Sequence, residues 1–148
     1  MIEGVAVTGA RYTLHLLPAA RWQAWQAAPA DERYAPDAFA ADGFIHCTDG
    51  SDEMVAVANR FYAADPGPFV VLSIDLGALD VPWRFDDPEG LYPHVYGTLP
   101  RAAIRDVAPI ERAADGSFAT VGPATPVPRT GEAPAPIGSL TLKPRIGD

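Results

Sequence analysis

The three histidines of this chain each lie inside a short apolar run whose side chains alternate in character. His15 lies in Tyr-Thr-Leu-His-Leu-Leu (12–17), His46 in Phe-Ile-His-Cys-Thr (44–48) and His94 in Pro-His-Val-Tyr-Gly-Thr-Leu (93–99). Successive side chains of a β-strand point to opposite faces, so each histidine shares a strand face with a hydroxyl residue two positions away. The pattern predicts three strands whose polar faces line one cleft.

Two segments have the features of helices. Residues 19–28 follow Pro18, which suits a first helical turn, and Trp22 and Trp25 form one apolar edge. Residues 52–64 follow Ser51, an expected N-cap, and their apolar side chains recur at helical spacing. These apolar residues are Met54, Val57, Ala58 and Phe61.

The remaining apolar runs have the lengths and residue types of strands. Residues 69–74 are β-branched and aromatic and predict a strand buried on both faces. Residues 81–85, 94–99, 104–111 and 116–121 predict further short strands. The order β-α-β-α-β, followed by strands only, predicts an α+β fold in which two helices pack on a mixed or split β-sheet.

The composition predicts one domain with two flanking segments. A chain of 148 residues, 48% of them hydrophobic, can bury one core, which we assign to residues 12–122. Residues 1–11 have no clear period and are expected to form a flexible leader. Residues 123–148 hold 6 of the 16 prolines and few large apolar side chains, which predicts a disordered tail able to recruit a protein partner. Its removal is expected to leave the melting temperature nearly unchanged.

The charge and hydropathy of the chain narrow the classes of partner. The net charge is −8, and residues 1–122 contain no lysine, which disfavours nonspecific binding of nucleic acid. No apolar run reaches the length of roughly 20 residues that a membrane-spanning helix needs, and Cys47 is the single cysteine. We therefore expect a cytoplasmic protein whose partner is a small-molecule ligand.

Four motifs in this order resemble a known family. They are Tyr-x-Leu-His-Leu-Leu-Pro, Ala-Asp-Gly-Phe-Ile-His-Cys-Thr, Val-Ala-Asn-Arg-Phe and Tyr-Pro-His-Val-Tyr-Gly-x-Leu-Pro. Between Tyr12 and Val107 the chain is similar to a family of small bacterial proteins, domain of unknown function 952, whose fold resembles that of the ADP-ribosyltransferases. The resemblance implies NAD as a substrate.

The same resemblance implies roles for individual residues. His15 would hold the ribose of NAD, His46 and Thr48 would lie on the second strand of the site, and Glu89 would be the catalytic acid. The tRNA 2′-phosphotransferases offer the nearest analogy. This chain departs from them, because Leu16-Leu17 replaces a Gly-Thr pair and the second strand has no tyrosine.

Further side chains have the chemistry of ligand contacts. Thr13 and Thr48 can hydrogen-bond a ligand, Phe44 and Tyr96 can stack on a nicotinamide or adenine ring, and Arg60 can pair with a phosphate. His94 completes the predicted set of His15 and His46. Each residue also has an ordinary alternative, as a core side chain or a solvated charge. The histidines lie 31 and 48 positions apart without short metal-ligand spacing, so no metal is expected.

Two functions are consistent with these features. The first is binding of NAD or ADP-ribose, with transfer of ADP-ribose through a histidine-lined cleft and His15, His46 and Glu89 as catalytic residues. The second is a non-catalytic module on the same scaffold that binds a small metabolite or another protein.

Overall fold

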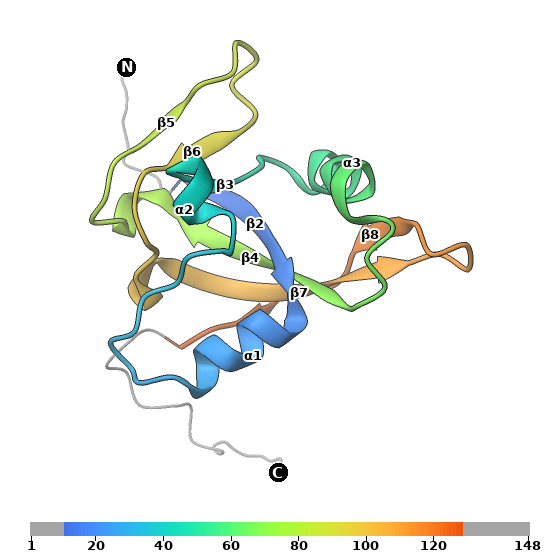
Figure 1. Cartoon of the computed structure of the whole chain (residues 1–148), viewed down its shortest axis with the longest axis horizontal. Helices are drawn as coiled ribbons and strands as arrows, with labels where there is room; N and C mark the ends of the chain where they lie inside the picture. The colour runs from blue at the N-terminus through green and yellow to red at the C-terminus, as the bar shows by residue number, and fades with distance from the viewer. Residues whose placement is uncertain (1–10, 129–148) are drawn as a thin grey trace.

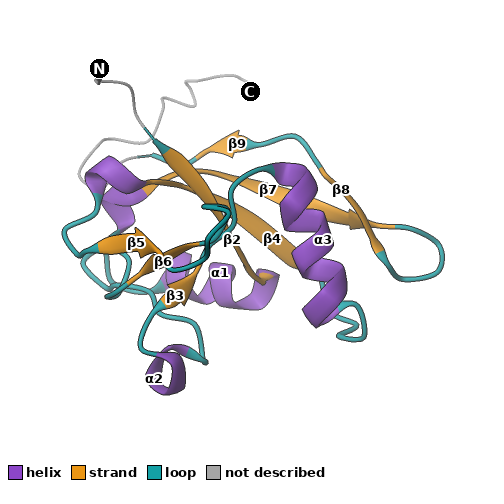
Figure 2. Cartoon of the chain, turned by 90° about the horizontal axis from the view of Figure 1, so that it is seen from above, coloured by secondary structure: helices purple, strands orange, loops and turns teal. Residues whose placement is uncertain are grey.

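Two antiparallel sheets form the framework of the protein, whose computed structural model describes residues 11–128. The large sheet has the order β2-β4-β7-β8, with β9 also paired to β7 (Figures 1 and 2). Its strands are β2 (Tyr12–Pro18), β4 (Phe69–Asp75), β7 (Ile104–Arg112), β8 (Phe118–Val121) and β9 (Thr125–Pro126). The small sheet has the order β3-β6-β5. Its strands are β3 (Ile45–His46), β5 (Trp83–Phe85) and β6 (Pro93–Val95).

This architecture confirms the predicted α+β class. All strand pairs within residues 11–128 are antiparallel, so the sheet is split and not mixed. The two predicted helices are α1 (Ala19–Ala27) and α3 (Ser51–Tyr62). A short helix, α2 (Phe39–Asp42), lies in the connector before β3, and two 3₁₀ helices, η1 (Leu76–Ala78) and η2 (Arg101–Ala103), follow β4 and precede β7.

Helix α3 begins one position earlier than the sequence predicts. Gly50 is the N-cap, with a φ of 89° that favours glycine, and Ser51 is the first helical residue. Met54 and Ala58 are buried against the large sheet. Asn59 fixes the helix to β8, because its side-chain amide donates to the carbonyl of Phe118 (2.9 Å) and its oxygen accepts from the Phe118 amide (2.7 Å).

The large sheet is covered on both faces, as alternation along its strands requires. On β4, Leu72 and Ile74 lie in one cluster with α1, while Phe69 and Val71 lie in another with α3. Burying each such side chain contributes about 1.5–3 kcal/mol of folding free energy. The predicted strand buried on both faces is therefore confirmed.

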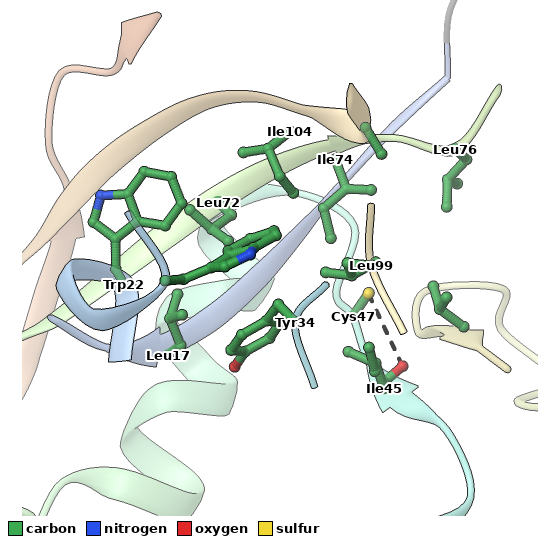
Figure 3. Close-up of a cluster of buried hydrophobic side chains, with 13 residues drawn as sticks. Leu17, Trp22, Tyr34, Ile45, Cys47, Leu72, Ile74, Leu76, Leu99 and Ile104 are labelled. Carbon is green, nitrogen blue, oxygen red and sulfur yellow. Dashed lines mark hydrogen bonds between the residues drawn. The ribbon is translucent and has the colours of Figure 1, made fainter. Parts of the chain in front are cut away.

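The first of these clusters also supports the small sheet. Figure 3 shows side chains from α1, β4 and β7 converging with Tyr34, Ile45 and Cys47. A bridge between Leu14 and Thr48 joins β2 to the residues after β3, with N–O distances of 2.8 and 3.0 Å. A second bridge, between Tyr34 and Leu99, fastens the connector after α1. These contacts fix the small sheet at one side of the molecule, with α3 and β8 at the other (Figure 1).

The predicted boundary of the domain is wrong at its C-terminal side. Residues 123–128 belong to the fold, since β9 pairs with β7 and the amide of Val127 donates to the carbonyl of Arg105 (2.9 Å). Val127 also packs against the core cluster around α1. The sequence does not predict an ordered strand here, because residues 123–128 are rich in proline, which is typical of disordered segments. Most of the predicted leader (1–10) and most of the predicted tail (129–148) lie outside the described residues.

Within residues 11–128, no helix combines the length and apolar character needed to cross a membrane.

Candidate functional site

The small sheet presents one face to the core and the other to solvent. Ile45 and Val95 lie opposite each other on β3 and β6 and are fully buried. One position along, His46 lies opposite His94, and His94 lies opposite Arg84 of β5. Because side chains alternate along each strand, these three residues form a row across the sheet on its outer side.

Aromatic rings surround this row. The rings of His46 and His94 have centroids 5.3 Å apart and are nearly perpendicular, at 74°. Phe44 stacks on His94, with centroids 4.0 Å apart and an interplanar angle of 14°, and it also contacts His46 and Tyr96. The Arg84 guanidinium lies 4.4 Å from the centre of the Tyr96 ring. The structure thus brings together four of the predicted site residues: Phe44, His46, His94 and Tyr96.

Asp86 and Asp42 orient the polar groups of this cluster. Asp86 accepts hydrogen bonds from the Tyr96 hydroxyl, from Nε of Arg84 (2.7 Å) and from Nδ1 of His94 (2.8 Å). Nε2 of His46 donates to Asp42 (2.9 Å), the last residue of α2. The hydrogen bonds from Tyr96, Arg84 and His94 hold the pKa of Asp86 well below its usual range, so its carboxylate is ionised. The bond to Asp86 in turn raises the pKa of Tyr96.

We call this cluster the His46–His94 face. It comprises Phe44, His46, Arg84, Asp86, His94 and Tyr96. The exposed fraction of the side chain is 61% for His46, 17% for His94 and 66% for Arg84, so a ligand has access to all three.

His15 does not join the other two imidazoles on this face. It is 4% exposed, its Nδ1 donates to the carbonyl of His46 (2.8 Å), and its Nε2 accepts from the Tyr34 hydroxyl (3.0 Å). Burial lowers the pKa of His15 to about 4, which keeps the ring neutral. The predicted cleft lined by three histidines is therefore wrong in this respect, because the face of β2 that holds His15 is buried and the ring is hydrogen-bonded to β3 and to Tyr34.

The two predicted threonines are also interior. Thr13 is 1% exposed and its hydroxyl has no hydrogen-bond partner among the described residues, while Thr48 is 4% exposed and its backbone pairs with Leu14. Neither side chain lies at a surface that a ligand reaches. Thr13 lies on β2, and Thr48 lies two residues after the end of β3, where the bridge to Leu14 joins the two sheets.

Within residues 11–128, neither Arg60 nor Glu89 forms a hydrogen bond or ion pair with a side chain of the His46–His94 face. Arg60 is exposed on α3 beside Phe61. The hydroxyl of Tyr92 donates to Glu53, which raises the pKa of Tyr92, and the positive charge of Arg60 opposes this rise. Glu89 is exposed in the turn after β5 and has no hydrogen bond or ion pair within residues 11–128. The acid beside His94 is Asp86, three positions earlier in the chain.

The sequence contained signals for the residues that prediction missed. A hairpin of the predicted strands 81–85 and 94–99 places Arg84 and Asp86 beside His94. Asp42 precedes His46 by four positions, and the left-handed Gly43 (φ 80°) turns the chain between them. Tyr34 had no such signal, because it lies in a connector without periodicity.

A pocket of about 280 Å³ lies elsewhere, between α1 and the residues that follow β9. Its lining includes the apolar side chains of Trp22, Trp25, Ile104 and Val127, together with Arg101. In the described part of the chain, no group of three or more His, Cys, Asp or Glu side chains is arranged to hold a metal ion.

Solved structures with a similar fold cover most of the chain. The crystal structure of protein CC0527 from Caulobacter crescentus has a TM-score of 0.59 at 22% identity, over 74% of this chain and 94% of that one. The solution NMR structure of CC0527 has a TM-score of 0.55 at 23% identity, over 71% and 89%. A structure named EcPltA has a TM-score of 0.53 at 14% identity, over 83% and 91%. At these identities the likeness shows the fold alone.

The family comparison covers the motifs that contain His46 and His94, whereas the motif that contains His15 ends before residue 19, where the match begins. No curated protein matches the chain. Residues 19–107 match the family described as Protein of unknown function (DUF952), and this range includes His46, His94 and the whole small sheet. Because the match spans more than half of the chain, the protein belongs to this family.

Proposed function

We propose that the His46–His94 face binds a nucleotide containing ADP-ribose, such as ADP-ribose itself or NAD. The observation that supports this most is the row of His46, His94 and Arg84 across three strands. Imidazole nitrogens can donate to or accept from ribose hydroxyls, and a guanidinium suits phosphate oxygens. Phe44 and Tyr96 supply flat apolar surface for a base or a nicotinamide ring.

The surrounding hydrogen bonds favour binding at this face. Asp86 fixes His94, Tyr96 and Arg84 at once, and Asp42 fixes His46, so that little side-chain entropy remains to be lost when a ligand binds. The buried Ile45 and Val95 on the opposite side of the same strands hold the backbone in place.

Transfer of ADP-ribose needs a catalytic carboxylate in addition to the groups that bind the nucleotide. A developing ribosyl cation is stabilised by a nearby carboxylate with a free oxygen. Asp86 already accepts three hydrogen bonds, and Glu89 lies in an exposed turn and forms no hydrogen bond with either imidazole among the described residues. We therefore propose binding as the function. Whether transfer follows is a separate question, which an assay of nicotinamide release answers.

Calorimetric titration with ADP-ribose, NAD and nicotinamide tests the proposal. We expect micromolar binding of ADP-ribose or NAD, a loss of at least roughly tenfold in affinity for Arg84→Ala and for His94→Ala, and unchanged affinity for Gln23→Ala on the exposed side of α1. No heat of binding at millimolar ligand would refute the proposal. Release of nicotinamide from labelled NAD, lost in His94→Ala, would show that transfer or hydrolysis of NAD follows binding.

A further inference from the structure

Each imidazole of the His46–His94 face has one nitrogen fixed by a carboxylate and one without a partner among the described residues. Asp42 accepts from Nε2 of His46 (2.9 Å), which leaves Nδ1, and Asp86 accepts from Nδ1 of His94 (2.8 Å), which leaves Nε2. A carboxylate on one ring nitrogen sets the tautomer and the orientation of the ring. The other nitrogen can then accept a proton from a bound substrate or water molecule, or donate one to it.

The two rings are close enough to act on one substrate. Their centroids lie 5.3 Å apart, and their residues are paired directly across β3 and β6. Two neighbouring imidazoles, one neutral and one protonated, are a general base and a general acid. His46 is the more exposed of the two rings (61% against 17%), so a water molecule reaches it more readily, and we assign His46 as the base and His94 as the acid.

Arg84 is the third member of the row and indicates the substrate class. Its Nε donates to Asp86, which leaves its two terminal amino groups without a carboxylate partner in the described part of the chain. A planar guanidinium with two free amino groups matches the non-bridging oxygens of a phosphate group. An acid, a base and a guanidinium in one row are the groups that cleavage of a phosphate ester uses.

We propose that this face hydrolyses nucleoside 2′,3′-cyclic phosphodiesters. Nδ1 of His46 accepts a proton from a water molecule, and the water oxygen forms a bond to phosphorus. The bond between phosphorus and one ribose oxygen breaks, and Nε2 of His94 gives its proton to that departing oxygen. The product is a nucleoside phosphomonoester, and proton exchange with solvent restores both imidazoles.

The cyclic diester is the substrate that this geometry favours. Strain in the five-membered ring lets an acid and a base open it with one guanidinium to hold the phosphate, and the half-buried rings of Phe44 and Tyr96 can contact the nucleoside base at their exposed edges. The inference rests on the proposed function only in placing a nucleotide on this face. It needs no affinity for ADP-ribose or NAD.

The charged groups around the two rings come from three elements. They are Asp42 of α2, Arg84 and Asp86 at β5, and the Tyr96 phenol after β6. Because one imidazole must be neutral and the other protonated, the rate should pass through a maximum with pH and fall on both sides.

The test is hydrolysis of the 2′,3′-cyclic phosphates of adenosine, guanosine, cytidine and uridine by the full chain, with the product identified as a phosphomonoester. We expect hydrolysis of at least one of them, with kcat/KM reduced by about 100-fold or more in His46→Ala and in His94→Ala. Arg84→Ala should raise KM, and Gln23→Ala should match the wild type. Circular dichroism of each variant checks that it is folded.

A double variant, His46→Ala with His94→Ala, purified in the same way, measures any contaminating phosphodiesterase. A wild-type rate no higher than that of the double variant, or full activity in a folded single variant, would overturn the inference. Binding of ADP-ribose without hydrolysis would overturn the inference alone. Hydrolysis without binding of ADP-ribose or NAD would overturn the proposed function alone.

Discussion

His15 shows how a residue with catalytic chemistry can have a structural role. Both of its ring nitrogens are hydrogen-bonded inside the protein, one to the backbone of β3 and the other to Tyr34. It thereby links β2, β3 and the connector after α1, and it holds the strand from which His46 reaches solvent. The imidazole of His15 must be neutral in this arrangement, because one ring nitrogen donates a hydrogen bond and the other accepts one.

This neutral form predicts a pH dependence of stability. The pKa of His15 is about 4 in the folded protein and 6.5 in the unfolded chain, so the unfolded chain binds the proton more readily between these values. Stability from this group is complete above pH 6.5 and is lost as pH falls toward 4, by up to about 1.4 kcal/mol per pH unit. Urea denaturation at a series of pH values measures the slope.

The comparison is with His15→Gln, which cannot titrate and retains His46 and His94. We expect this variant to be less stable at pH 7 by roughly 1–3 kcal/mol, because a shorter side chain cannot satisfy both Tyr34 and the His46 carbonyl. Its stability should fall less steeply than that of the wild type between pH 6.5 and 4. Parallel slopes for the two proteins would show that His15 is not the buried neutral group described above.

At the scale of elements, Gly97 determines how closely the segment after β6 approaches the segment before β5. A Cβ atom at this position would lie 2.5 Å from Cγ1 and 2.7 Å from Cβ of Val81, so an alanine requires the two segments to separate. We predict that Gly97→Ala lowers the free energy of unfolding by about 1–3 kcal/mol. Gly67→Ala, whose nearest neighbour would be 3.7 Å away, is the control. Equal stability of the two variants in urea would contradict the close packing.

The last described strand gives a second prediction at this scale. A chain that ends at Pro128 keeps β9 and Val127, whereas a chain that ends at Gly122 loses both and uncovers part of the core beside Trp22 and Trp25. We expect the shorter chain to melt at least about 4 °C lower than the one that ends at Pro128, as a loss of about 1 kcal/mol or more implies. Equal melting temperatures would show that β9 adds nothing to the fold.

At the scale of the whole molecule, the sequence predicted the elements well and their packing incompletely. Apolar periodicity located α1, α3, β4 and β7 to within one or two residues, because those segments bury regular faces. It placed β3 but overestimated its length, since only two of its residues form the ladder. It also missed β9, whose pairing depends on an edge that β7 presents and not on the composition of residues 125–126.

The candidate site was predicted in the same partial way. Alternation along the strands correctly grouped Phe44 with His46 and His94 with Tyr96. Alternation cannot tell which polar face meets solvent, so Thr13, His15 and Thr48 were assigned to a ligand although they are buried. The sequence predicts Glu89 as the acid of the site, whereas the acid bonded to His94 is Asp86. Only the pairing of β5 with β6 shows which acid lies beside His94.

The central claim is that a nucleotide binds on the outer side of the small sheet. Amide chemical shifts of the labelled protein, recorded during titration with ADP-ribose, test it most directly. We predict that the largest changes fall on residues 44–46, 84–86 and 94–96 and are absent in His94→Ala. Changes confined to the pocket lined by Trp22, Trp25 and Arg101, or no changes at millimolar ligand, would contradict the account.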